Sequence, residues 1–148
     1  MVTTAKLGRV TGKLTPQRRT TLVKRMTTTV DEWIDAAYPD GPYPGAGFTD
    51  AFDIFTAGAA RRAKEDAALM SNAGLGVDVD SVEMLGRTLT IDVLAVGGAA
   101  AGVTAHVALK MEISGATDRQ ERVTGSMFLT YDGGRWHVFG YEMDRGGL

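Results

Sequence analysis

The stretch VTAHVALKMEI, residues 103–113, decides the fold class of this chain. Apolar residues occupy every odd position of the stretch, and the even positions hold polar or small residues. This period of two predicts a β-strand with one buried face and one exposed face. The same alternation predicts three further strands, which are RTLTIDVLAV (87–96), RVTGSMFLTY (122–131) and RWHVFGYEM (135–143).

Glycine-rich segments connect these strands. We expect GGAAAG, residues 97–102, to form a loop of odd length, because both flanking strands place their odd residues in the core. DGG, residues 132–134, predicts a tight hairpin turn. A two-residue turn there, at Asp132 and Gly133 or at Gly133 and Gly134, directs His137 away from the core. A three-residue loop directs it inward, and we predict the outward orientation.

Two helices are expected before the strands. Thr15 is a suitable N-cap and Pro16 fits the first helical position. One apolar stripe follows at spacings of three and four, at Leu22, Val23, Met26, Val30, Trp33, Ile34 and Ala37. The segment YPDGPYPGAG, residues 38–47, ends this helix. A second helix is predicted from the N-cap Thr49 to SNAGLG, residues 71–76, with a buried side at Phe48, Phe52, Phe55, Ala59, Ala63 and Met70.

Helices followed by strands predict an α+β fold. We expect two N-terminal helices packed on a curved, four- to five-stranded antiparallel sheet, with the fifth strand near residues 79–85. Residues 1–13 are polar and without period, so they are expected to form a disordered tail. Residues 14–145 are expected to form a single domain, since 148 residues suit one hydrophobic core.

This order of elements and the final hairpin LTYDGGRWHVFGYE, residues 129–142, resemble the nuclear transport factor 2-like superfamily, a cystatin-like cone. The resemblance implies that Trp136 and Val138 point into the cone. The hairpin is most similar to extracytoplasmic domains of actinobacterial envelope proteins, such as the mammalian cell entry associated proteins. An extracytoplasmic or membrane-anchored location is therefore implied, with attachment through a segment that this chain does not contain; otherwise we expect the cytoplasm. Only GLGVDVDSVEML, residues 74–85, stands where many members have a third helix and an extra hairpin, so the cone is expected to be abbreviated.

The composition argues against several classes of function. The net charge of −2 does not favour nucleic acid, because that binding rests on neutralising phosphates. The chain has no cysteine and two histidines, so a thiolate or histidine-rich metal site is poorly supplied. No apolar run reaches the roughly 18 residues that span a bilayer. We expect no metal, no cofactor and no nucleic-acid partner.

The superfamily that the chain resembles includes isomerases, dehydratases and epoxide hydrolases with titratable groups inside the cone. Here the expected cone wall has none, since it consists of Leu89, Ile91, Val93, Ala95, Val103, Ala105, Val107, Leu109, Met111, Ile113, Val123, Met127 and Leu129. We therefore assign no catalytic residue. The alternative is a protein that uses the cone for a small apolar ligand, or an isomerase- or hydrolase-like enzyme. Its pocket would be lined by Trp33, Phe52, Phe55, Tyr131 and Trp136.

The opposite face of the sheet carries both polar and apolar residues. Asp92 is expected there in an ion pair with Lys110, if Ala95 pairs with Ala105. If Leu94 faces His106 and Ala108 faces Phe128, an apolar patch forms, and we assign it to Leu94, His106, Ala108, Phe128 and Phe139. Such a patch favours an interface, either a homodimer or a contact with another protein. The alternative is that the tail or the proline-rich loop covers it. We expect a non-enzymatic interaction or accessory domain, in keeping with the cell envelope.

Overall fold

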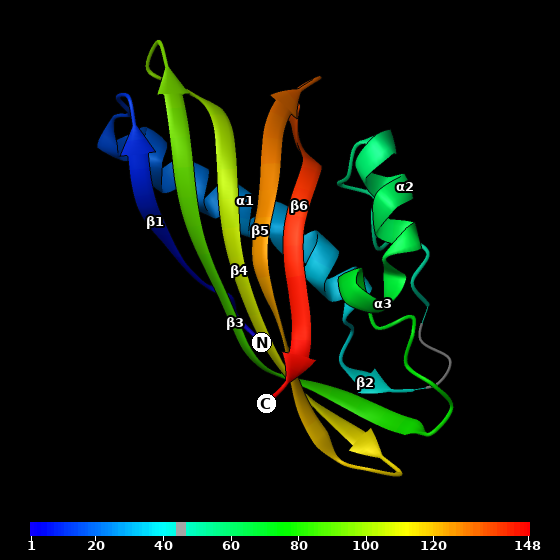
Figure 1. The fold of residues 1–148 in the computed structure, drawn as a ribbon. Coiled ribbons are helices and arrows are strands. Elements are labelled where there is room, and N and C mark those ends of the chain that lie inside the picture. The colour runs from blue at the N-terminus through cyan, green and yellow to red at the C-terminus, as the bar shows by residue number, and fades with distance from the viewer. Residues whose placement is uncertain (44–46) are drawn as a thin grey trace.

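The computed structural model describes residues 1–43 and 47–148, and it has an α+β fold with one curved, mixed sheet of six strands (Figure 1). The order across the sheet is β1-β3-β4-β5-β6, and β2 pairs with β3 beside this path. The strands are β1 (Thr4–Thr11), β2 (Gly41–Pro42), β3 (Val79–Val96), β4 (Ala99–Gly115), β5 (Arg119–Asp132) and β6 (Arg135–Gly147). The helices are α1 (Pro16–Ala37), α2 (Ala57–Glu65) and α3 (Ala67–Met70).

Helix α1 crosses one face of the sheet, while α2 and α3 lie beside β6 (Figure 1). The opposite face, which we call the outer face, has no helix over it in Figure 1. No helix in the described part of the chain is long and apolar enough to cross a membrane. The architecture therefore leaves one side of a large sheet available for contact.

Helix α1 begins where the sequence predicts. Thr15 is the N-cap, its side chain accepts a hydrogen bond from the Arg18 N–H at 3.2 Å, and Pro16 opens the helix. The predicted apolar stripe is buried except for Val23, which is half-buried. Because the side chains of this stripe fall on one side of the helix, they pack against the apolar face of the sheet.

The expected disordered tail is wrong for Thr4–Thr11, which forms β1. This strand pairs in parallel with β3, so that Thr4 lies beside Thr88 and Leu7 beside Ile91. The sheet is consequently mixed and has six strands, not four or five antiparallel ones. An edge strand buries little apolar surface, so its sequence can be polar. The polar sequence of residues 4–11 therefore gave no sign of a strand. Since β1 lies in the plane of the sheet, it does not fold over the outer face.

The second helix starts later than expected. Thr49 does not cap it; α2 begins after the N-cap Thr56. The Thr56 N–H donates to the Val138 carbonyl at 2.8 Å, and the Val138 N–H donates to the Ile54 carbonyl at 2.9 Å. These bonds tie residues 54–56 to the edge of β6, so this segment is extended and a helix cannot begin before it.

Most of the expected buried side of the second helix still enters the core. Phe55, Ala59, Ala63 and Met70 are buried, whereas Phe48 and Phe52 are half-buried. The proline-rich segment ends α1 at Ala37, and it then supplies β2 and the buried Tyr43. Its residues 44–46 lie outside the described part of the chain.

The period of two in the strands is confirmed. All thirteen positions expected to face the interior are buried, as are Trp136 and Val138. The β5–β6 hairpin has a two-residue turn at Gly133 and Gly134, with φ of +60° and +80°, and Asp132 pairs with Arg135. His137 therefore lies on the outer face, as predicted.

The expected loop at residues 97–102 is wrong. The β3–β4 hairpin also turns on two glycines, Gly97 and Gly98, with φ of +61° and +80°. The pairing then passes from Ala95 with Ala100 to Leu94 with Gly102, so Ala101 is an extra residue on β4. This β-bulge, and not a loop of odd length, keeps the odd residues of both strands in the core.

Arg145 of β6 fastens the segment after α3 to the sheet. Its guanidinium donates to the carboxylate of Glu121 at 2.8 Å, to the side-chain oxygen of Asn72 at 2.8 Å and to the Ser71 carbonyl at 2.9 Å. Its side chain is only 11% exposed. Arg87 of β3 makes a comparable link to α1, through Asp31 and Asp35 at 2.7 Å each.

The parallel pairing of β1 predicts a hydrogen-exchange pattern. Amide protons of Thr4–Thr11 that bond to β3 are expected to exchange much more slowly than those of Val2 and Thr3, because exchange requires the edge of the sheet to open. Amide exchange resolved by NMR measures this difference. Uniformly fast exchange through residue 11 would support the tail and contradict the strand.

Arg145→Ala is expected to lower the free energy of unfolding by about 3 kcal/mol, because it leaves the Ser71 carbonyl and the buried Asn72 side-chain oxygen without their donor and removes one of the two arginines that bond to the Glu121 carboxylate. Chemical denaturation measures the change. Arg61→Ala, at an exposed position of α2, is the control and is expected to change the free energy by less than about 0.5 kcal/mol. Equal effects of the two substitutions would contradict the role given to Arg145.

Candidate functional site

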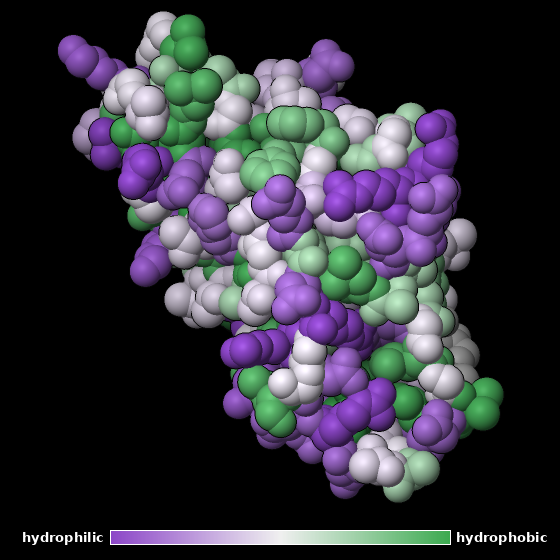
Figure 2. Space-filling view, viewed as in Figure 1, coloured by the Kyte–Doolittle hydropathy of each residue, from purple (hydrophilic) through white to green (hydrophobic). Residues whose placement is uncertain are grey.

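The outer face of the sheet exposes a cluster of large apolar side chains. Leu94 and Val96 of β3 are 50% and 64% exposed, and Phe139 of β6 is 55% exposed. The ring of Phe139 lies 6.4 Å from that of the half-buried Phe128 on β5. Figure 2 shows apolar atoms gathered over the upper part of this face, with polar side chains between and below them. Exposed apolar groups gathered in this way are typical of an interaction surface.

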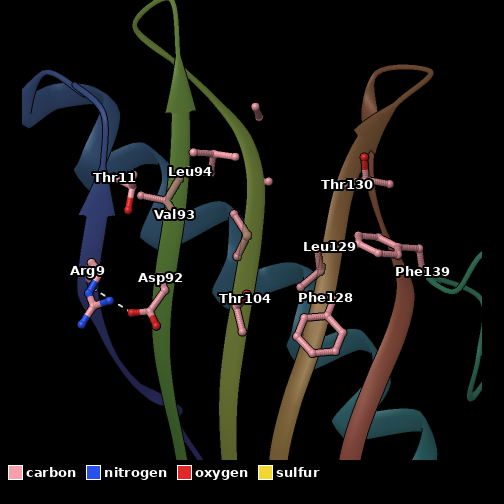
Figure 3. A pocket seen from close by; sticks show the side chains of 13 residues that line it. Arg9, Thr11, Asp92, Val93, Leu94, Thr104, Phe128, Leu129, Thr130 and Phe139 are labelled. Atoms are coloured by element: carbon pink, nitrogen blue, oxygen red, sulfur yellow. Dashed lines mark hydrogen bonds between the residues drawn. The ribbon is translucent and has the colours of Figure 1, made fainter.

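A shallow groove of about 440 Å³ runs through this cluster. Thr104 of β4 lies between Leu94 on one side and the two phenylalanines on the other (Figure 3), and Gly102 of the same strand also lines the groove. Leu94 lies directly across from Gly102, and Thr104 lies across from Phe128. The groove exists because small residues of the central strand β4 lie between large residues of the neighbouring strands. We call Leu94, Val96, Phe128, Phe139 and this groove the apolar patch.

Polar side chains border the groove. Asp92 of β3 accepts a hydrogen bond from the Arg9 backbone N–H of β1 at 2.8 Å (Figure 3). The other Asp92 oxygen lies 2.8 Å from His106 Nε2, and His106 Nδ1 lies 3.1 Å from Ser126 Oγ. Three adjacent strands thus carry a hydrogen-bonded chain of Asp92, His106 and Ser126. Asp92 therefore pairs with His106, and the expected ion pair with Lys110 is wrong.

The pKa of the Asp92 carboxyl lies below its usual range. The Arg9 N–H is the main cause, because it stabilises the charged form, and the His106 hydrogen bond adds to the effect. The His106 and Asp92 side chains are 46% and 39% exposed, so water reaches both. This is a surface hydrogen-bond chain that fixes the His106 ring.

Ser126, His106 and Asp92 are the residue types of a catalytic triad, but their surroundings do not suit acyl transfer. Ser126 sits in the middle of β5, paired with His106 on one side and with Glu142 on the other. Hydrolysis needs N–H groups aimed at a developing oxyanion. Strand amides that pair with two neighbours do not provide this, and a carboxylate beside the serine disfavours a second negative charge.

The structure separates the five residues that the sequence assigned to the patch. Leu94, Phe128 and Phe139 border the groove. His106 and Ala108 lie further along β4, where they pair with Ser126 and with Thr124. The expected pairings of Leu94 with His106 and Ala95 with Ala105 are wrong, because the two-residue glycine turn is shorter than the expected loop. The expected pairing of Ala108 with Phe128 is also wrong, since β4 and β5 pair Ala108 with Thr124.

The sequence missed three residues that shape the groove, Arg9, Gly102 and Thr104. Arg9 lies in the segment that was expected to form a disordered tail. Gly102 was placed in a loop, and Thr104 shares the outward parity of the predicted patch. A correct strand register would have identified Gly102 and Thr104, because both follow from the pairing across β3, β4 and β5.

The five residues expected to line an interior ligand pocket do not form one. Trp33 and Phe55 are buried in the core with ring centroids 6.4 Å apart, and Phe52 packs on Phe55 at 5.3 Å. Tyr131 and Trp136 pair with each other at 5.4 Å and border an open cleft beside α1. The expected interior wall is filled by side chains of α1 and the sheet.

Within residues 1–43 and 47–148, no group of three His, Cys, Asp or Glu side chains is arranged to hold a metal ion. No protein-family model matches this chain, and no curated protein or solved structure matches it significantly. The outer face is therefore assessed on its own geometry.

The lowered pKa of Asp92 predicts how its contribution to stability depends on pH. The folded-state pKa lies below the ordinary value of 3.8, so this contribution is fully present above about pH 3.8. It is lost as the pH falls through the folded-state pKa. Asp92→Asn is therefore expected to reduce the free energy of unfolding near neutral pH and to change it little at strongly acidic pH. Denaturation at both values, with the exposed Asp132→Asn as control, measures this. An effect of equal size at both pH values would contradict the assignment.

Proposed function

We propose that this chain is an interaction domain that binds a second copy of itself through the apolar patch of its outer face. The observation that carries the proposal is the exposure of Leu94 and Phe139 at a groove, and of Val96 on the same strand as Leu94, on a sheet face that no helix covers in Figure 1. Burial of these side chains against a partner contributes free energy in proportion to the apolar area removed from water.

Features of the patch favour a second copy as the partner. A symmetric dimer uses the same surface on both subunits, so the surface must be complementary to itself. The patch has a raised pair, Phe128 and Phe139, beside a groove over Gly102 and Thr104, so the pair of one copy can occupy the groove of the other. Arg9 and Asp92 at its border supply charges of both signs, which a rotated copy can match.

The outer face is formed by long strands. A stable interface needs about 800 Å² from each partner. Strands β3, β4 and β5 span the face with 18, 17 and 14 residues. The polar residues below the patch would then form the rim that surrounds an apolar centre.

The resemblance to the nuclear transport factor 2-like superfamily is part of the proposal. A curved sheet packed on one long helix, and a final hairpin that buries Trp136 and Val138, support it. The location in a cell envelope, which the resemblance implies, belongs to the same proposal. An accessory role of this kind needs a binding surface and no catalytic group.

Phe139→Lys is expected to convert the dimer into a monomer, because it places a charge at the centre of the apolar interface. Sedimentation velocity over a range of protein concentrations measures the mass. The control is Thr124→Lys, which adds the same charge on β5 at an outward position beyond the groove. It is expected to weaken the dimer much less.

Circular dichroism establishes that both variants are folded. A wild-type protein that remains a monomer at all concentrations would overturn the proposal. Equal dissociation by the two lysine substitutions would also contradict it, because the apolar patch would then have no special part in the dimer.

A further inference from the structure

A second concave region lies on the other side of the sheet from the apolar patch. An open cleft of about 830 Å³ separates the N-terminal half of α1 from the tips of the two glycine-turn hairpins. Its apolar wall includes Leu14, Leu22, Ala100 and Trp136. Ligand sites of drug-sized molecules commonly range from about 300 to 1,000 Å³, so this cleft has room for one.

The charged side chains of this cleft all have the same sign. Lys13, Arg18 and Arg25 line it, and no aspartate or glutamate does. None of the three forms an ion pair with a carboxylate of the described residues. Arg18 instead donates a hydrogen bond to the Gly98 carbonyl across the cleft. On a chain with net charge −2, this concentration of unpaired positive charge is local.

The aromatic end of the cleft supplies a second, independent observation. Trp136 is 7% exposed, and its indole N–H has no acceptor among the described residues. Arg87 Nε is the only fully buried side-chain nitrogen or oxygen without a partner among the described residues, so the Trp136 N–H is not fully buried. A largely buried tryptophan with a free donor, placed at the edge of a cleft, is suited to hold a ligand.

A neighbouring cleft extends the same chemistry. It shares Arg25, Tyr131 and Trp136 with the first, and it adds Arg135 together with one carboxylate, Glu32. The aromatic pair of Tyr131 and Trp136 therefore lies between Arg25 of α1 and Arg135 at the start of β6. An apolar body can rest on the aromatic pair while a negative head group reaches the arginines.

From these features we infer that the cleft binds an anionic amphiphile, a molecule with an apolar chain and a carboxylate or phosphate head. The head group contacts Arg18 and Arg25, since guanidinium groups form strong, charge-assisted hydrogen bonds with such anions. The chain packs against Leu22 and Trp136 and accounts for the apolar part of the wall. This site is separate from the apolar patch and does not depend on dimer formation.

The two tryptophans make the test direct. The Trp33 indole N–H bonds to the Met70 carbonyl in the core at 3.1 Å, whereas that of Trp136 is free. In NMR spectra of the full chain, titration with sodium decanoate or decyl phosphate is expected to shift the Trp136 indole signal and not that of Trp33. Decanol, which has the same chain without the charge, is expected to produce little shift.

Matched variants define the role of charge. Arg25→Gln is expected to weaken binding severalfold, and Arg18→Gln combined with Arg25→Gln by about tenfold or more, since each removes a charge-assisted bond. Arg25→Gln is also measured alone because Arg18 has a structural bond to Gly98. Arg61→Gln, which removes an exposed charge on α2, is the control and is expected to bind as the wild type does.

The titrations show whether the cleft binds an anion and which head group it prefers. Binding of decyl phosphate without decanoate would support the site and restrict the head group to phosphate, and the reverse result would restrict it to carboxylate. No shift of Trp136 with either anion at millimolar concentration would overturn the inference. Equal binding of decanol, or an equal loss in Arg61→Gln, would overturn it as well.

Discussion

Two pairs of glycines, Gly97 with Gly98 and Gly133 with Gly134, close the β3–β4 and β5–β6 hairpins of the four long strands. All four residues have positive φ, which side chains other than glycine rarely adopt, and each pair closes a two-residue hairpin. A shift of one residue would exchange the inner and outer faces of a strand. The outward position of His137 depends on the second turn, and the burial of the interior residues of β3 and β4 depends on the first turn together with the bulge at Ala101.

Because α1 and the sheet bury their apolar side chains against each other, most titratable groups of β3, β4 and β5 lie on other surfaces. The interior positions of β4 and β5 are apolar, and the buried Arg87 of β3 is paired with Asp31 and Asp35 of α1, whereas Asp92 and His106 lie on the outer face. The basic residues Arg18 and Arg25, in the N-terminal half of α1, line the cleft on the other side of the sheet. The two surfaces proposed to bind partners are therefore on opposite sides of one packed core, and each can act without the other.

Much of this fold can be predicted from sequence because its rules are local. Alternation identified the interior of the strands, and Thr15 with Pro16 identified the start of α1. The errors arose where tertiary contacts decide. Backbone hydrogen bonds to Val138 hold residues 54–56 extended, so α2 begins after them. The polar segment Thr4–Thr11 forms β1 because it pairs with β3. The two-residue turn and the bulge at Ala101 set the pairing of β4 with β3, so the members of the apolar patch were partly predicted while their neighbours were not.

The parallel edge strand has a consequence for how the chain folds. Thr4 pairs with Thr88, so β1 is made early in synthesis but has no partner until β3 exists. The β-hairpins close over short loops, whereas joining β1 to β3 must close a long one, which costs more chain entropy. β1 therefore leaves the ribosome before the other strands of this sheet but is among the last of them to be placed. Until then the edge of β3 is open to strands of other chains, which makes the timing of β1 docking a determinant of aggregation.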